Sequence, residues 1–104
     1  MATWEDVRRI AGALPDVEES TSYGRPAFKV KGRAFVGLSS HEPGALVVHC
    51  RPEEQALLVL GRPDVYFVTP HYEGYGAVLI RLETTDENEL AGAIEDAYET
   101  VGSA

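Results

Sequence analysis

Two short runs of alternating apolar and polar residues flank the dipeptide Lys31-Gly32. In the first run, Phe28 and Val30 alternate with lysines, which is typical of a strand with one buried face. Gly32 can adopt the positive φ that a tight hairpin turn needs. The pattern therefore predicts a β-hairpin whose second strand covers 33–38, and any fold of this chain has to contain that antiparallel pair.

The rest of the chain divides into helical and extended segments by the same reasoning. In chain order we predict a helix between Thr3 and Pro15, a polar loop over Asp16–Gly24, strands opening at Pro26 and over Arg33–Leu38 and Ala45–Cys50, a helix from Pro52 to Gly61, strands over Val65–Thr69 and Ala77–Leu82 with a loop between them, and a helix from Asp86 to Val101. The order α-β-β-β-α-β-β-α predicts a single domain over 1–104 of the α+β class, an antiparallel sheet of about five strands with packed helices. The alternative is a ferredoxin-like βαβ arrangement, in which Ala45–Cys50 and Val65–Thr69 would pair in parallel.

Each predicted element has an apolar face that indicates which side chains fill the core. On the helix from Pro52 to Gly61, we expect Ala56, Leu57 and Leu60 to face inward. The side chains expected to be mostly buried are Trp4, Phe28, Val30, Leu46, Val48, Leu57, Val78, Ile80 and Ile94.

The charge composition limits the partners of the protein. The formal net charge is −8, which disfavours non-specific nucleic-acid binding because that binding depends on phosphate neutralisation by Lys and Arg. The charges are uneven, however, since six of the nine basic residues precede position 34 and the last predicted helix is acidic. No apolar run approaches the roughly 20 residues that span a bilayer, so we expect a cytoplasmic protein with no membrane partner.

The candidates for catalysis or metal binding are few. The histidines His41, His49 and His71 lack the short spacings of zinc or iron sites, so we expect no metal, no cofactor and no enzymatic activity. Cys50 lies beside Arg51 and just before a predicted helix, two features that can lower a thiol pKa. The favoured interpretation of Cys50 is a small buried residue at a strand end.

Two surface features remain as candidate binding sites. The basic hairpin contains Arg25, Lys29, Lys31 and Arg33, and its alternative interpretation is an edge strand whose lysines block sheet-to-sheet pairing. The tyrosine loop, over 70–76, contains His71, Tyr72 and Tyr75. Tyrosines on an exposed loop can stack on bases or anchor a partner, and the alternative is that one folds back onto the core.

Several motifs together resemble the MmcQ/YjbR family of small bacterial domains. They are Ser-Tyr-Gly-Arg-Pro-Ala-Phe-Lys-Val at 22–30, Arg-Pro-Glu-Glu at 51–54, Thr-Pro-His-Tyr at 69–72 and Val-Leu-Ile-Arg-Leu at 78–82. The resemblance implies an α+β fold with an antiparallel sheet, and it implies DNA binding without a cofactor or a catalytic set.

If the DNA-binding label of the family applies, the contacts should run through the basic hairpin, with Tyr72 or Tyr75 stacking on bases. Four phosphate contacts imply a slope of log K against log salt of about −3 to −4, so binding should be weak and salt-sensitive. The acidic composition supports the alternative, a protein- or peptide-interaction module that uses the sheet edge or the tyrosine loop.

Overall fold

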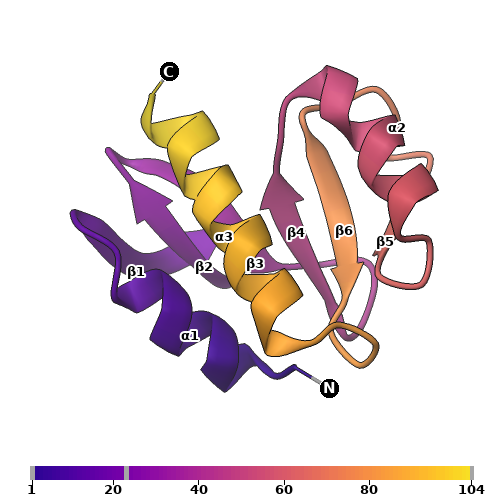
Figure 1. Cartoon of the computed structure of the whole chain (residues 1–104). Helices are drawn as coiled ribbons and strands as arrows, with labels where there is room; N and C mark the ends of the chain where they lie inside the picture. The colour runs from indigo at the N-terminus through magenta and orange to yellow at the C-terminus, as the bar shows by residue number, and fades with distance from the viewer. Residues whose placement is uncertain (1, 23, 104) are drawn as a thin grey trace.

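A computed structural model describes residues 2–22 and 24–103. It contains three helices and six strands (Figure 1). In chain order the elements are α1 (Trp4–Gly12), β1 (Val17–Ser22), β2 (Arg25–Val30), β3 (Arg33–Leu38), β4 (Ala45–His49), α2 (Pro52–Gly61), β5 (Tyr66–Phe67), β6 (Ala77–Arg81) and α3 (Glu87–Gly102).

All six strands form one antiparallel sheet in the order β1-β2-β3-β4-β6-β5. The predicted hairpin is β2 and β3, with Lys31 and Gly32 at positive φ in its turn. The strand β4 pairs with β6, and β5 pairs with the far side of β6. The ferredoxin-like alternative is therefore wrong, and the α+β antiparallel fold is confirmed.

The strand β1 lies inside the segment predicted to be a loop, Asp16–Gly24. Its sequence, VEESTS, has one apolar residue and therefore lacks the alternation that marks a strand with a buried face. Such a sequence is compatible with an edge strand, which covers little of the core. What holds it is backbone pairing with β2 along its whole length, from Val17 opposite Val30 to Ser22 opposite Arg25. The sheet therefore has one strand more than predicted, and β2 is an inner strand rather than a lysine-protected edge.

The helices α1 and α3 cross the same face of the sheet (Figure 1). The core lies between them and the strands, and most of the predicted core residues are buried there: Phe28, Val30, Leu46, Val48, Val78, Ile80 and Ile94. Trp4 packs against this core half-buried, with its ring 5.4 Å from that of Phe28. No helix that the structure describes covers the opposite face of β2, β3 and β4 (Figure 1).

The helix α2 has the predicted bounds, but the side chains predicted to face the core are exposed. Leu57 and Leu60 are 68% and 79% exposed, and Ala56 is exposed as well. Gln55 is buried instead, and Leu58 and Val59 pack against the core. The cause is that apolar residues surround this helix on nearly every side, so its sequence contains no single stripe that decides its orientation.

The helix ends follow ordinary capping chemistry. Thr3 caps α1 by accepting a hydrogen bond from the Asp6 N–H, Pro52 opens α2, and Asp86 accepts from the Glu89 N–H at 2.7 Å. The Glu89 carboxylate accepts from the Tyr66 hydroxyl at 2.6 Å, which ties α3 to β5.

Among the described residues, no helix is long and apolar enough to cross a membrane.

Candidate binding cavity

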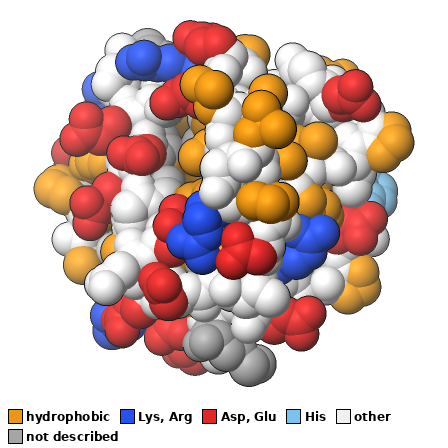
Figure 2. Space-filling model, turned by 45° about the vertical axis from the view of Figure 1, so that its right-hand side comes forward, with side chains coloured by type: hydrophobic (Ala, Val, Ile, Leu, Met, Phe, Trp, Pro, Cys, Tyr) orange, Lys and Arg blue, Asp and Glu red, His pale blue; other side chains and the backbone are white. Residues whose placement is uncertain are grey.

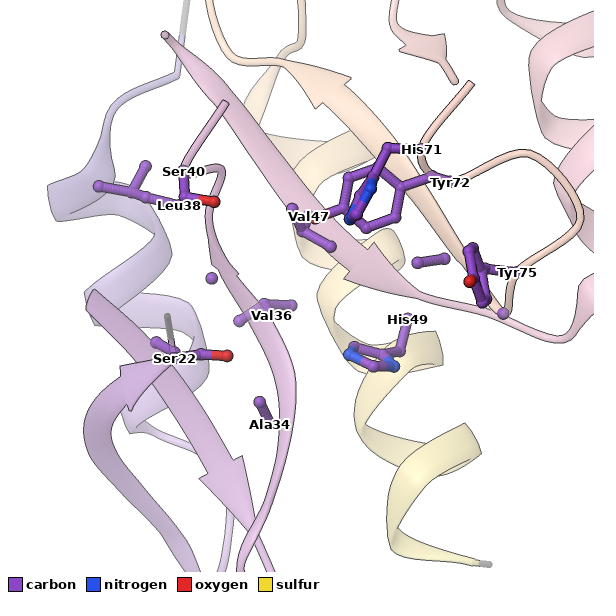
Figure 3. Close-up of a pocket in the computed structure, with 14 residues that line it drawn as sticks. Ser22, Ala34, Val36, Leu38, Ser40, Val47, His49, His71, Tyr72 and Tyr75 are labelled. Carbon is purple, nitrogen blue, oxygen red and sulfur yellow. The ribbon is translucent and has the colours of Figure 1, made fainter. Parts of the chain in front are cut away.

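A cavity of about 470 Å³ opens on the face of the sheet that α1 and α3 leave uncovered (Figure 3). Its floor belongs to β2, β3, β4 and β6. Its rim comes from Ser22 at the end of β1, from Ser40 after β3, and from the tyrosine loop before β6. Figure 3 shows Tyr72 and Tyr75 on one side of the opening and the strands β2 and β3 on the other.

The floor of the cavity is hollow because its side chains are small. Ala27, Gly37 and Val47 are register partners across β2, β3 and β4, and all three line the cavity. A Cβ atom at Gly37 would lie 3.0 Å from the Cβ of Ala27, so these two strands leave little room for a larger side chain. Ala34 and Ala77 extend the same small-residue surface.

The tyrosine loop that forms the wall is held by one buried side chain, Gln55 of α2. Its amide nitrogen lies 2.8 Å from the Tyr72 carbonyl oxygen, 3.1 Å from that of Tyr75 and 2.7 Å from that of Ala77. Its amide oxygen accepts from the Gly74 N–H at 3.1 Å. Gln55 therefore fixes the main-chain positions of Tyr72 and Tyr75, the two tyrosines of the wall.

A close backbone approach fixes the other end of this loop. The Cys50 N–H donates to the Gly76 carbonyl at 3.0 Å, and a Cβ at Gly76 would lie 2.9 Å from the Cys50 carbonyl oxygen. Only glycine fits there without a shift of the backbone. The residue is needed for contact between two main chains, and this accounts for one of the two glycines in the loop.

The three histidines, which are far apart in the sequence, gather around the cavity. His49 and His71 line it, and the His41 ring centroid lies 5.3 Å from that of His71. His71 also meets Tyr72 edge-on, at 4.8 Å between centroids. Within 2–22 and 24–103 no three His, Cys, Asp or Glu side chains come together as a metal site would require.

His49 differs from the other two histidines in its surroundings. Burial lowers its pKa, and the charge of Arg33 lowers the pKa further. The imidazole is therefore predominantly neutral at neutral pH, with one nitrogen able to donate and the other able to accept a hydrogen bond.

The structure divides the four basic residues of the hairpin between the two faces. Arg25 and Lys29 alternate with core residues of β2 and lie opposite Ser22 and Ala34, which line the cavity, so both share its face. The Lys31 ammonium donates to the Gly102 carbonyl at 2.8 Å, at the end of α3.

Arg33 is not assigned to either face: it is exposed, and its charge acts on His49, which lines the cavity. Arg33 is the register partner of the core residue Val30, at the start of β3. Of the seven candidate binding residues named from the sequence, three line the cavity, namely His71, Tyr72 and Tyr75, and two more, Arg25 and Lys29, lie on the same face of the sheet.

Cys50 is buried at the end of β4, as the favoured interpretation predicted. Burial raises the pKa of its thiol to about 11, with a further contribution from Glu54 and Glu53. Proximity to the start of α2 does not lower the pKa, because these two glutamates occupy that helix end. A reactive thiolate is therefore not formed at neutral pH.

Sequence reasoning missed Gln55, His41 and His49 as parts of the site. The presence of three histidines in a chain of 104 residues was a signal, but only the fold could show that His41 meets His71 and that His49 lines the same cavity as His71. For Gln55 no signal existed, since a glutamine after two glutamates on a helix is typical of an exposed position.

Comparisons with known proteins identify the class of this domain. The crystal structure of protein DR2400 from Deinococcus radiodurans, with a DUF419 domain, superposes with a TM-score of 0.80 over 97% of this chain and 79% of that chain, at 23% identity. The chain therefore has the α+β fold of that domain.

The sequence comparisons identify the family. The uncharacterised proteins Rv2570 of Mycobacterium tuberculosis and Mb2600 of Mycobacterium bovis are each 34% identical to this chain over 112 residues, covering 94% of this chain and 87% of theirs. The sequence model of the YjbR family matches residues 12–100. The chain belongs to the YjbR family.

Proposed function

We propose that this protein is a non-catalytic DNA-binding domain that acts in the cytoplasm and holds DNA weakly on the open face of its sheet. One observation carries the proposal: Arg25 and Lys29 lie on the same face of the sheet as the cavity that His71, Tyr72 and Tyr75 line. Cations that neutralise phosphates and rings that stack on bases are the two components of single-strand binding surfaces. The acidic helix α3 covers the opposite face, where it does not meet the phosphates.

The arrangement of the hairpin reduces the expected number of phosphate contacts from four to two. Lys31 is engaged by the Gly102 carbonyl, and Arg33 lies across from a core residue. Two contacts give a slope of log K against log salt of about −1.4 for a single strand and −1.8 for a duplex. Glu18, the register partner of Lys29, lowers the local potential further, so binding is expected only at low salt.

The test is a fluorescence-anisotropy titration of labelled single-stranded and duplex oligonucleotides at several low salt concentrations. The double variant R25E/K29E should abolish binding. The matched control, E95K/E99K, changes the net charge by the same amount on α3 and in the opposite direction, and should retain binding. Affinity that survives R25E/K29E would contradict contact through this face, and no binding at low salt would reject the DNA proposal.

A second candidate function, a protein-interaction module, is favoured by the exposed leucines of α2. Leu57 and Leu60 are one helical turn apart, and Figure 2 shows apolar side chains gathered on the face that α2 presents to the viewer. Exposed aliphatic side chains of this kind are typical of partner contacts. Quantitative capture from native extract should then lose one specific partner with L57Q/L60Q and keep it with R25E/K29E. The reverse result would reject this candidate.

A further inference from the structure

The cavity on the open face has the size of a small-molecule site, independent of any polymer. Its volume of about 470 Å³ falls within the range of about 300–1,000 Å³ in which proteins bind small ligands. It is formed by chain segments from 22 to 77, so the whole sheet has to fold before it exists.

The floor favours a flat, apolar group. Ala27, Gly37 and Val47 present a nearly bare sheet surface, and none of these side chains can donate or accept a hydrogen bond. A planar ring lying on them would remove apolar surface from water on both partners. An alkyl chain could do the same, so the side chains of the cavity walls decide whether a ring or an alkyl chain binds better.

The walls favour an aromatic ring. His71 and Tyr72 meet edge-to-face at 4.8 Å, and Tyr75 lies 6.5 Å from His71 between ring centroids. Tyr75 is 63% exposed, which leaves much of its surface available to a ligand. Aromatic groups gain from edge-to-face and offset contacts with such rings beyond the area that they bury.

Two cations of β2, Arg25 and Lys29, lie on the face of the sheet that holds the cavity, next to residues of its lining. Lys29 is the register partner of Ala34 on the floor, and Arg25 is the partner of Ser22 on the rim. Within the described part of the chain, neither cation forms an ion pair with a carboxylate within 4.0 Å. Glu18 lies across from Lys29 on the same face and partly offsets its charge, but it is too far for such a pair.

We propose that this cavity binds a small aromatic acid, with one or two fused rings on the floor of Ala27, Gly37 and Val47 and the acidic group toward Lys29. The neutral imidazole of His49, at the same end of the floor, can hydrogen-bond a ring heteroatom or the acid. This inference goes beyond DNA binding and does not depend on it.

Two probes of nearly equal shape test the inference, indole-3-acetate and its neutral analogue indole-3-acetamide. Each is titrated into the ¹⁵N-labelled full chain, and binding is followed by amide chemical shifts. Both should shift residues of β3, β4 and the tyrosine loop, and the acetate should bind about fivefold more tightly, as one partly exposed ion pair allows. K29Q should remove that difference and leave the affinity of the acetamide unchanged.

Cavity-filling variants test the location. A34L and V47F, on different strands, each fill the floor and should weaken both probes about tenfold or more, while L57Q, on exposed α2, should change neither. Shifts confined to α2, or undiminished binding by folded A34L and V47F, would overturn the cavity site. Equal affinity of the two probes for the unaltered chain would overturn the assignment of an acid. Neither outcome depends on whether oligonucleotides bind.

Discussion

A single glutamine has more influence on the site than any of its aromatic residues. Gln55 is buried among main-chain groups of the tyrosine loop and the start of β6, and its two amide N–H groups are shared among three carbonyls while its amide oxygen accepts from one N–H. A buried amide with both ends satisfied stabilises one conformation, because any other would leave polar groups without partners. The geometry of the tyrosines is thus set from α2.

Replacing Gln55 with leucine should loosen this wall. The change keeps much of the side-chain volume but removes all four hydrogen bonds, so it should destabilise the protein by about 1–3 kcal/mol. Amide exchange should accelerate over 72–77 and change little in β2 and β3. The control is L57Q on the exposed face of the same helix. Unchanged exchange over 72–77 would mean that the loop is held by its own packing.

His49 should make folding stability sensitive to mild acid. Its pKa is lowered in the folded protein from an ordinary value of 6.5, so below about pH 6.5 the unfolded chain binds a proton that the folded chain resists. The free energy of unfolding should therefore fall as the pH drops below 6.5, and the fall should end once the folded pKa is passed.

The measurement for His49 is a series of denaturant melts between pH 5 and 8. The variant H49Q should lack this part of the acid sensitivity, while H71Q, at an exposed position, serves as the control. If H49Q and the unaltered chain lost stability in parallel, the imidazole would not be resisting protonation in the fold.

At the scale of elements, the strands and helices differ in how firmly their sequences orient them. The strand β6 lies between β4 and β5 in the sheet, and its four apolar residues, Ala77 to Ile80, are all buried. The helix α2 is equally apolar, yet it packs only at one end of the sheet beside β5 and β6. One of its faces therefore has no neighbour, and Leu57 and Leu60 lie on it.

Alanine substitutions should separate these two elements clearly. Ile80→Ala in β6 removes a fully buried side chain and should destabilise the protein by about 2–5 kcal/mol. Leu57→Ala in α2 should change stability by about 0.5 kcal/mol or less, since the side chain is already exposed. Denaturant melts measure both, and a large effect of Leu57→Ala in the isolated chain would mean that this helix face is covered.

The whole molecule has one helix-covered face and one open face, and its charge follows that division in part. Acidic residues exceed basic ones by eight, and exposed ion pairs such as Arg8 of α1 with Glu19 of β1, at 3.0 Å, join neighbouring elements. Such exposed pairs contribute little, whereas an excess of like charge disfavours the compact state. Self-repulsion is therefore the larger electrostatic effect on this fold.

Added salt should raise the thermal stability of the protein. Screening weakens repulsion among the acidic residues over distances of about 10 Å at 0.1 M. The midpoint of thermal unfolding should rise between low salt and about 0.5 M sodium chloride, while DNA binding, if present, falls over the same range. A falling midpoint would show that the surface ion pairs outweigh the repulsion.

The sequence by itself determined most of the fold. The hairpin, the helix caps and the alternating core positions depend on local periodicity and on backbone conformations that few residue types adopt. The positive φ of Gly32 in the hairpin turn is one of these conformations. It also determined the basic and aromatic character of the candidate site, through Arg25, Lys29, Tyr72 and Tyr75. Each of these patterns is contained in a short stretch of the chain, so it can be recognised without the tertiary structure.

Only the tertiary structure decided which of these groups meet. The strand β1 forms because its main chain pairs with the backbone groups of β2 that β3 does not use. The helix α2 has Gln55 on its buried side because this amide hydrogen-bonds main-chain groups of the neighbouring segment. His41 and His71 come together across thirty positions of sequence for the same kind of reason. Long-range pairing selects such contacts, and no local pattern encodes it.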